Sequence, residues 1–308
     1  PGVALRGRIM GKPVVLTYHC DLQLPKGLFN RIVDRFVLMQ NQMAGQLADV
    51  VVTYTRDYGT HSPFLSQYVD KKLQIVPPPV SLAACSDRVV DDFYNKHQLD
   101  GRAVIGISAR LATEKGVEIL LKALPVILKE FPNALVLHAG PYKDIIGEEA
   151  YAARLAPLFK KYAANYRLLG TLHGQELTAF YKSLDVLSIC SLNSTESFGL
   201  VQIEAMRNGV PVAACNLPGV RQPVTMTGMG EISAVGDHEA LAQAIINILR
   251  DKEKYARDAQ LIANSFDPAE TAAAYLTLFN ELKNGKPHRV STEPAAYDRL
   301  REMRDQAG

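Results

Sequence analysis

At residues 103–116 the sequence reads AVIGISARLATEKG, an apolar strand pattern that runs into a short polar turn, and a strong helical pattern follows from Val117. In a doubly wound parallel sheet, such a turn lies at the carboxyl end of a strand, where ligands bind. Arg110 and Lys115 stand on either side of this turn, so their cationic heads can converge on one anion. The competing interpretation is two solvated charges on an exposed loop, because charged residues are mostly exposed.

A second strand-to-helix turn occupies residues 194–212, STESFGLVQIEAMRNGVPV, directly after a strand pattern at 185–189. We expect Gly199 to open a helix, whose first backbone N–H groups have no intrahelical partner and form an anion site. Glu196 precedes this helix and Glu204 lies about one and a half turns inside it. The two carboxylates then flank the anion site and can accept hydrogen bonds from a vicinal diol. Alternatively, one glutamate caps the helix and the other is merely exposed.

A third strand pattern, at residues 14–18, is followed at once by His19 and Asp21. A lone histidine in this position is more often a structural residue than a catalyst. The sequence has no second histidine or carboxylate at the spacing that would indicate a metal site. It also has neither a GxSxG motif nor a Walker lysine loop.

Short apolar runs alternate with helical patterns along the whole chain, which is typical of parallel α/β architecture. Strands are predicted at Val14–Tyr18, Val50–Tyr54, Leu73–Val76, Ala103–Ile107, Ala134–Ala139, Tyr166–Leu169, Val186–Ile189, Val212–Ala214 and Gly230–Ala234. Residues 1–12 have the pattern of a helix end, and full helices are predicted at Gly27–Gln46, Val117–Phe131, His238–Arg250, Lys252–Ser265 and Pro268–Lys283.

The predicted helix over 27–46 is amphipathic. One stripe carries Phe29, Ile32, Val33, Phe36, Val37 and Met43. Such a stripe is typical of a face buried in a core. Lys26, Arg31 and Arg35 lie near it, and basic amphipathic helices can also rest on anionic lipid, so a peripheral membrane contact is the alternative.

Length and composition indicate an ordinary globular protein of about two domains, with 308 residues, 47% hydrophobic and 21% charged. The net charge of +2 gives no general case for nucleic-acid binding, and no apolar run is long enough to span a bilayer. The four cysteines, Cys20, Cys85, Cys190 and Cys215, form no CxxC pair. This pattern argues against a disulfide framework and against a cysteine zinc site, and it fits a reducing compartment such as the cytoplasm.

Taken together, the three strand-end segments resemble the retaining glycosyltransferases of family four, also called glycosyltransferase group 1, which have the GT-B fold of two facing Rossmann-like domains. The resemblance covers nearly all of residues 13–283. The motifs that carry it are YHCD at 18–21, SARLATEKG at 108–116, LG at 169–170 and ESFGLVQIE at 196–204, followed by GVPV at 209–212. A Rossmann oxidoreductase is disfavoured, because GxGxxG is absent.

The resemblance implies an α/β GT-B enzyme that moves a hexose from a nucleotide-diphosphate sugar, of the GDP-mannose or UDP-glucose type, to a saccharide or glycolipid with retention of configuration. It implies no metal and no cofactor, no nucleic-acid partner, and a cytoplasmic role in building a cell-envelope polysaccharide or glycolipid. The implied catalytic residues are His19, Arg110, Lys115 and Glu196. The implied donor-binding residues are Arg110, Lys115, Leu172, Glu196, Ser197, Phe198, Gly199, Leu200, Val201 and Glu204.

Domain boundaries are expected near the stiff Pro77-Pro78-Pro79 run. We expect a partial acceptor-side Rossmann-like domain over 1–80 and a nucleotide-sugar-binding domain over 81–265. A helix over 266–284 should pack back toward the first domain, and 285–308 should form a loose polar tail. The family's first strand and glycine-rich loop do not precede His19, so the first domain is expected to be truncated. A nucleotide-sugar-binding fragment without transferase activity is therefore the alternative function.

Overall fold

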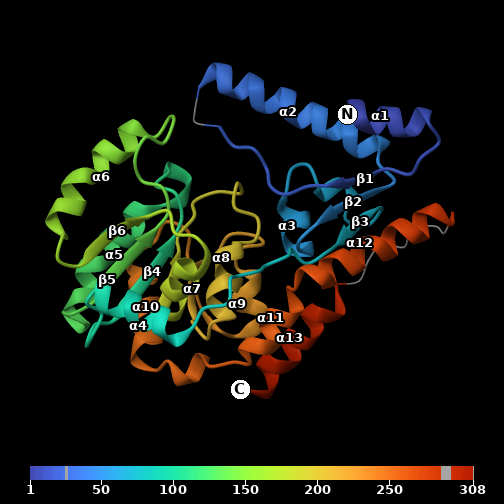
Figure 1. The fold of residues 1–308 in the computed structure, drawn as a ribbon. Coiled ribbons are helices and arrows are strands. Elements are labelled where there is room, and N and C mark those ends of the chain that lie inside the picture. The colour runs from blue at the N-terminus through green and yellow to red at the C-terminus, as the bar shows by residue number, and fades with distance from the viewer. Residues whose placement is uncertain (25–26, 286–292, 308) are drawn as a thin grey trace.

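The computed structural model describes residues 1–24, 27–285 and 293–307, and within them the chain forms two parallel sheets covered by helices (Figure 1). The smaller sheet has the strand order β1-β2-β3, and the larger has the order β6-β5-β4-β7-β8-β9. The strands are β1 (Val15–Thr17), β2 (Val50–Thr53), β3 (Leu73–Ile75), β4 (Val104–Ser108), β5 (Leu135–Ala139), β6 (Tyr166–Gly170), β7 (Val186–Ile189), β8 (Val212–Cys215) and β9 (Gly230–Ser233). Each overlaps a predicted strand, so the prediction of an α/β fold with parallel sheets is confirmed.

The strands form where the sequence is apolar almost without interruption, because both faces of a parallel sheet are covered. Every residue of β2, β5, β7 and β8 is buried. Neighbouring strands in both sheets pair in parallel, for example β4 with β5 and with β7.

The helices are α1 (Gly2–Ile9), α2 (Leu28–Leu47), α3 (Arg56–His61), α4 (Asp87–Lys96), α5 (Val117–Glu130), α6 (Glu149–Lys161), α7 (Gly174–Lys182), α8 (Leu200–Met206), α9 (Gln222–Thr227), α10 (His238–Arg250), α11 (Ala259–Ser265), α12 (Pro268–Lys283) and α13 (Ala295–Gln306). We call residues 2–75, from α1 to β3, the small lobe, and residues 87–265, from α4 to α11, the large lobe. The single helix predicted over 252–265 is divided, because a 3₁₀ turn (Glu253–Tyr255) is followed by extended backbone and α11 starts afresh with Asp258 as its cap.

The path of the chain through the larger sheet creates a switch point between β4 and β7. From β4 the chain winds outward through β5 and β6, then returns to the other side of β4 and winds outward through β7, β8 and β9. Helix α5, after β4, packs in one hydrophobic core, whereas α8, after β7, packs in the other. In open α/β sheets, ligands bind in the crevice at such a point, outside the carboxyl ends of the strands.

Helix α12 returns from the large lobe to the small one. Leu278 is buried with Val50 and Val52 of β2, and the Tyr275 hydroxyl lies 2.9 Å from the Thr17 hydroxyl of β1. The small sheet is therefore covered on one side by a helix from the far end of the sequence.

The stripe predicted on α2 is not a buried face. Phe29, Ile32, Phe36 and Met43 are 76%, 60%, 57% and 46% exposed, so the expectation of a core face is wrong for these four residues. Helix α2 packs on the lobe mainly through its last turns, where Ala44 and Gly45 are buried. Periodicity identified the apolar face, but only the neighbours of a helix decide whether that face is covered. Lys26 lies outside the described residues.

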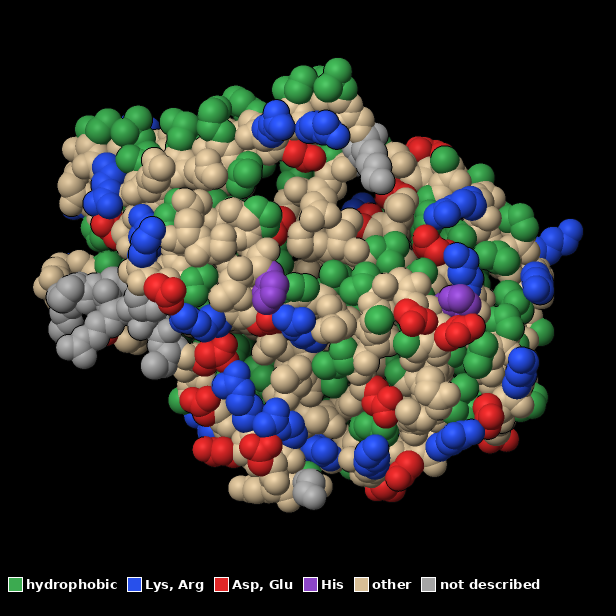
Figure 2. All heavy atoms as spheres, turned by 180° about the vertical axis from the view of Figure 1, so that it is seen from behind, with side chains coloured by type: hydrophobic (Ala, Val, Ile, Leu, Met, Phe, Trp, Pro, Cys, Tyr) green, Lys and Arg blue, Asp and Glu red, His purple; other side chains and the backbone are tan. Residues whose placement is uncertain are grey.

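The exposed apolar surface continues onto α1. Figure 2 shows hydrophobic side chains along the edge where α1 and α2 lie, with Lys and Arg side chains beside them. On α1, Val3 and Ile9 are 90% and 77% exposed. We call this surface, formed by the exposed apolar residues of α1 and α2, the α1–α2 face. None of the helices in the described part of the chain is both long and apolar enough to cross a membrane.

The expectation of a loose polar tail over 285–308 is also wrong, for residues 295–306. Residues 295–306 form α13, in which Tyr297 and Leu300 are fully buried. The Tyr297 hydroxyl donates to the Tyr54 carbonyl at 2.8 Å, which ties α13 to the small lobe. The average composition of this segment is polar, but its few apolar residues share one side of the helix. Part of the expected tail, residues 286–292 and 308, lies outside the described residues.

Candidate functional site

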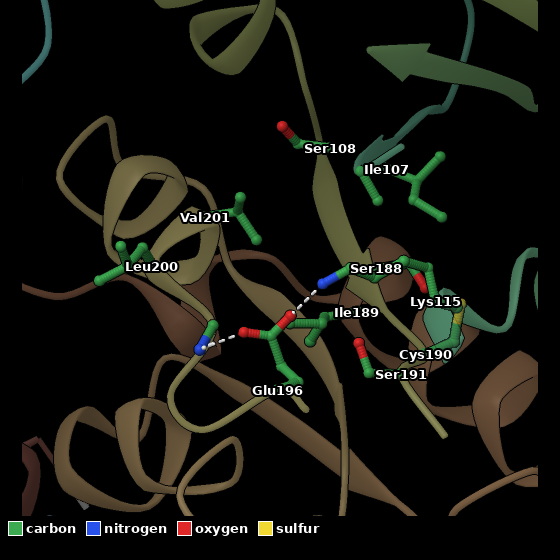
Figure 3. A pocket seen from close by; sticks show the side chains of 12 residues that line it. Ile107, Ser108, Lys115, Ser188, Ile189, Cys190, Ser191, Glu196, Leu200 and Val201 are labelled. Atoms are coloured by element: carbon green, nitrogen blue, oxygen red, sulfur yellow. Dashed lines mark hydrogen bonds and ion pairs between the residues drawn. The ribbon is translucent and has the colours of Figure 1, made fainter. Parts of the chain in front are cut away.

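A pocket of about 220 Å³ lies at the switch point of the larger sheet. Its walls come from the carboxyl ends of β4 and β7 and from the start of α8 (Figure 3). The lining residues are Ile107, Ser108, Ala109, Lys115, Ser188, Ile189, Cys190, Ser191, Glu196, Gly199, Leu200 and Val201. The two segments that the sequence indicated as ligand-binding turns therefore meet in one cavity, which we call the switch-point pocket.

Lys115 and Glu196 form an ion pair in the wall of this pocket. The Lys115 Nζ lies 2.6 Å from Glu196 Oε2, and both side chains are largely buried, with 23% and 19% exposure. The other carboxylate oxygen of Glu196 accepts a hydrogen bond from the Gly199 N–H at 3.1 Å. Figure 3 shows the Glu196 carboxylate between these two donors. Glu196 thus bonds the N–H of the residue that precedes α8, but the helix has no side-chain cap, so the capping role in the alternative interpretation is not what the structure shows.

Glycine at position 116 allows Lys115 to reach this place. Gly116 has a φ of +62°, in the left-handed region that side chains disfavour. A Cβ there would lie 2.1 Å from the Cys190 carbonyl oxygen at the end of β7. Any larger residue would push the lysine turn away from β7, and so away from Glu196.

Arg110 lies outside the switch-point pocket. Its guanidinium pairs with Glu114 on the same turn, and the side chain is 50% exposed. It lines a neighbouring cavity together with Thr171 and Leu172 from the end of β6. The two cavities share Ser108 and Ala109, so an extended ligand could occupy both.

Glu204 lies inside α8 and is not part of the pocket lining. It is half-buried, and its carboxylate accepts a hydrogen bond from the Tyr181 hydroxyl of α7. Burial raises the pKa of Glu204, although the Tyr181 hydrogen bond and the charge of Arg207 oppose this effect. The group therefore holds its proton more tightly than an ordinary glutamate.

The remaining predicted residues of the 196–204 segment divide into two groups. Gly199, Leu200 and Val201 line the switch-point pocket. Ser197 and Phe198 are 7% and 1% exposed, and the Phe198 ring packs against Tyr54 and Phe266. Phe198 thus packs in the hydrophobic core between the lobes.

His19 belongs to the small lobe and is exposed, with its Nδ1 at 2.5 Å from the Tyr54 hydroxyl. The pKa of the next residue, Cys20, is influenced by two charged residues of the switch-point pocket, Glu196 and Lys115. Burial raises the pKa of Cys20, the Asp21 and Glu196 carboxylates add to this, and Lys115 opposes it. This loop also contacts the other lobe directly, because the Gln23 side-chain amide donates to the Ser194 hydroxyl at 2.8 Å.

Several residues at this junction were not found by the sequence analysis. Tyr181 bonds Glu204 from a different helix, and Tyr58 bonds the loop that carries Glu196. Asp57 pairs with Arg221 of the large lobe at 2.5 Å. These partners are separated by 23 to 164 residues, so no local pattern could have indicated them.

A cation, a carboxylate and a helix start at one pocket are suited to an anionic ligand that also carries hydroxyl groups. Within residues 1–24, 27–285 and 293–307, no group of three or more His, Cys, Asp or Glu side chains is placed to hold a metal ion.

Comparison with known proteins places these features in a family. The sequence model of the family described as Glycosyl transferases group 1 matches residues 90–264. A phosphatidyl-myo-inositol mannosyltransferase from Mycolicibacterium smegmatis is 30% identical over 179 residues, which is 58% of this chain and 43% of the relative. A D-inositol 3-phosphate glycosyltransferase from Corynebacterium glutamicum is 29% identical over 184 residues, again 58% of this chain and 43% of the relative. The aligned part is thus less than half the length of each of these curated relatives.

Solved structures show the same fold. The Anabaena protein HepE, in a complex with UDP, superposes with a TM-score of 0.74 at 22% identity, over 90% of this chain and 74% of that one. Sucrose-phosphate synthase from Thermosynechococcus elongatus gives a TM-score of 0.74 at 22% identity, over 92% of this chain and 72% of that one. At this identity the likeness concerns the fold alone, which is the GT-B arrangement expected from the sequence.

Proposed function

The chain belongs to the group 1 glycosyl transferases, and from this premise we propose that it moves a hexose from a nucleoside-diphosphate sugar to a saccharide or glycolipid acceptor. The donor is of the GDP-mannose or UDP-glucose type. Relatives named as inositol mannosyl- and glycosyltransferases support this proposal, as does a structural neighbour in a complex with UDP.

The observation that carries the proposal is the Lys115–Glu196 pair at the switch point, beside the start of α8. We assign the switch-point pocket to the diphosphate and the sugar, and the adjoining cavity with Arg110 and Leu172 to the base. Glu204 is assigned to the ribose hydroxyls. When the glycosidic bond breaks, the departing diphosphate gains negative charge, and fixed cations aimed at it lower the barrier. Lys115 and Arg110 supply these cations without a metal.

Glu196 and the backbone of residues 197–201 would contact the sugar, and His19 would face the sugar from the small lobe. We propose retention of configuration, which the family resemblance implies, with the acceptor attacking on the face that the diphosphate leaves. In this mechanism the Glu196 carboxylate accepts hydrogen bonds from Lys115 and from the Gly199 N–H, and it is not assigned as a covalent nucleophile.

Nucleotide binding tests the donor site. Calorimetry with UDP and with GDP, in EDTA and in magnesium, should show binding in both buffers. Lys115→Ala and Arg110→Ala should each weaken binding by about 1.5–3 kcal/mol, the range for a charged hydrogen-bond partner. Lys122→Ala, which removes an exposed lysine of α5, serves as the control. Unchanged affinity in the first two variants, or binding only with magnesium, would contradict the assignment.

A transfer assay separates the enzyme from the alternative function. Release of UDP from UDP-glucose, or of GDP from GDP-mannose, on addition of a saccharide or lipid acceptor supports the transferase. Tight nucleotide binding without release supports the sugar-nucleotide-binding fragment instead.

We further propose that the α1–α2 face contacts an anionic membrane that carries the acceptor. Its apolar side chains are exposed, and Arg31 and Arg35 are exposed on α2 beside them. A basic amphipathic surface of this kind binds anionic lipid through both its apolar area and its charge.

A further inference from the structure

One tyrosine hydroxyl joins the two lobes at the proposed site. Tyr58 lies in α3 of the small lobe, where Thr55 caps the helix and the tyrosine side chain is only 1% exposed. Its hydroxyl accepts a hydrogen bond from the Asp21 N–H at 2.6 Å and donates one to the Ser194 carbonyl oxygen at 2.9 Å. Ser194 belongs to the large lobe, so a single oxygen atom bridges two segments that are far apart in the sequence.

The direction of both hydrogen bonds is fixed by chemistry. A backbone N–H can only donate and a carbonyl oxygen can only accept, so in these two hydrogen bonds the Tyr58 hydroxyl accepts from Asp21 and donates to Ser194. Burial, and then the nearby Asp21 carboxylate, raise the pKa of Tyr58 far above its ordinary value. The hydroxyl therefore stays protonated at neutral pH.

Each end of the bridge is two residues from a proposed catalytic side chain. Asp21 follows His19 by two residues, and Ser194 precedes Glu196 by two. Asp21 is itself held in the small lobe, because its Oδ1 accepts hydrogen bonds from the Tyr18 and Ser62 hydroxyls at 3.0 and 2.7 Å. The bridge thus connects a rigidly held loop of the small lobe with the loop that carries Glu196.

We propose that Tyr58 is a positioning residue whose hydroxyl fixes the His19 loop against the Glu196 loop. This inference rests on the proposed function for its catalytic meaning, but the bridge itself can be tested without turnover. A second contact runs alongside it, in which the Gln23 side-chain amide donates to the Ser194 hydroxyl at 2.8 Å. Gln23 is exposed, so Tyr58 supplies the buried part of the connection.

Tyr58→Phe removes the hydroxyl and keeps the buried ring. The matched control is Tyr68→Phe, because Tyr68 is also buried in the small lobe, with 5% exposure, and its hydroxyl only approaches the Gln42 carbonyl at 3.4 Å. Hydrogen exchange is measured on both variants of the full chain without ligand. We expect amide exchange to become about tenfold faster both at residues 19–22 and at 193–196 in Tyr58→Phe, and at neither in Tyr68→Phe.

A merely structural role predicts a different pattern. Faster exchange confined to α3 and residues 19–22, with 193–196 unchanged, would overturn the inference, because the large-lobe loop would not depend on the hydroxyl. If Tyr58→Phe yields too little folded protein, Gln23→Ala loosens the same loop from an exposed position. It should accelerate exchange at 193–196 by about threefold, roughly the loss of one exposed hydrogen bond. A tenfold or larger acceleration there would overturn the proposal, because the Gln23 contact and not the buried Tyr58 hydroxyl would then hold the two loops together.

Kinetics then connects the bridge with the reaction. With UDP-glucose or GDP-mannose as donor, Tyr58→Phe should lower kcat for sugar transfer by about 10- to 100-fold, because small misplacements of reacting groups cost this much. The affinity for UDP or GDP should stay within about twofold, since the proposed nucleotide contacts lie in the large lobe. Wild-type kcat in the variant would refute positioning. Absence of nucleotide binding by the wild-type chain would refute the proposed function instead, while the exchange result would still decide the bridge.

Discussion

One largely buried ion pair, between Asp57 and Arg221, joins the two lobes, and we expect its removal to destabilise the protein. The Asp57 carboxylate accepts hydrogen bonds from Arg221 at 2.9 and 2.5 Å and from the Gly219 N–H at 2.8 Å. The two side chains are only 15% and 27% exposed. Asp57→Asn removes the charge and sets an amide N–H against the guanidinium. A hydrogen bond to a charged group contributes about 1.5–3 kcal/mol, and partial solvent screening favours the lower end, so we expect a loss of about 2 kcal/mol.

The same small lobe provides a matched control. Asp70 pairs with Arg56 at 2.7 Å, but these side chains are 84% and 42% exposed. Exposed pairs contribute at most about 1 kcal/mol, so Asp70→Asn should cost much less than Asp57→Asn. The chemical change is identical, and only the burial of the pair differs.

Stability should also depend on pH through Asp57. Burial alone would raise its pKa, but the hydrogen bonds from Arg221 and Gly219 outweigh burial and lower it. Because the folded pKa lies below the unfolded value of about 3.9, the contribution is complete above that pH and is lost as the pH falls through the folded pKa. The difference between wild type and Asp57→Asn should therefore be constant from about pH 5 to 8 and shrink below about pH 4.

Urea unfolding followed by circular dichroism, at pH 7 and at pH 3.5, measures both effects. A double-mutant cycle with Arg221→Gln isolates the coupling between the two side chains. Equal losses for Asp57→Asn and Asp70→Asn, or a difference from wild type that does not fall in acid, would refute the reasoning.

Three further predictions concern a carboxylate, a histidine and a surface. Tyr181→Phe removes the donor that favours ionised Glu204, so the pKa of Glu204 should rise further, and UDP affinity measured by calorimetry should fall between pH 8 and 5.5 more steeply than in wild type. Burial lowers the pKa of His138 to about 4, so the free energy of unfolding should fall as the pH falls from about 6.5 toward 4. In His138→Gln, urea unfolding should show a weaker pH dependence of this free energy, by the amount that corresponds to uptake of about one proton. An unchanged pH dependence would contradict the burial argument. The double charge reversal Arg31→Glu and Arg35→Glu should lower flotation with anionic liposomes, whereas equal flotation would show that the α1–α2 face does not use its charge to bind lipid.

The sequence allowed prediction of every strand in the described part of the chain and of helices such as α2, α5, α10 and α12. Strands such as β2 and β7 are continuous apolar runs, and helices such as α10 begin and end where the pattern predicted. These features depend on the pattern of residues that are close in the sequence, and this pattern can be read from the sequence itself. The two turns that line the switch-point pocket could be predicted for the same reason, because a polar turn after a buried strand is a local signal.

The tertiary structure alone decided which side chains meet. Lys115 and Glu196 are 81 residues apart, and the sequence offered both as charged candidates without indicating that they pair. Their contact follows from the strand order, because β4 and β7 are neighbours although two strands separate them along the chain. Tyr181, Tyr58 and Asp57 were missed because their partners are equally remote.

Helix α2 gives the clearest contrast between the two levels. Its sequence determined a helix with an apolar stripe, because side chains three and four residues apart lie on the same side of any α-helix. Whether Phe29 and Ile32 on that stripe are buried was settled by what packs against them, and in this structure they are exposed. Amphipathicity is a property of one helix, whereas burial belongs to a pair of surfaces, and the second surface comes from residues distant in the sequence.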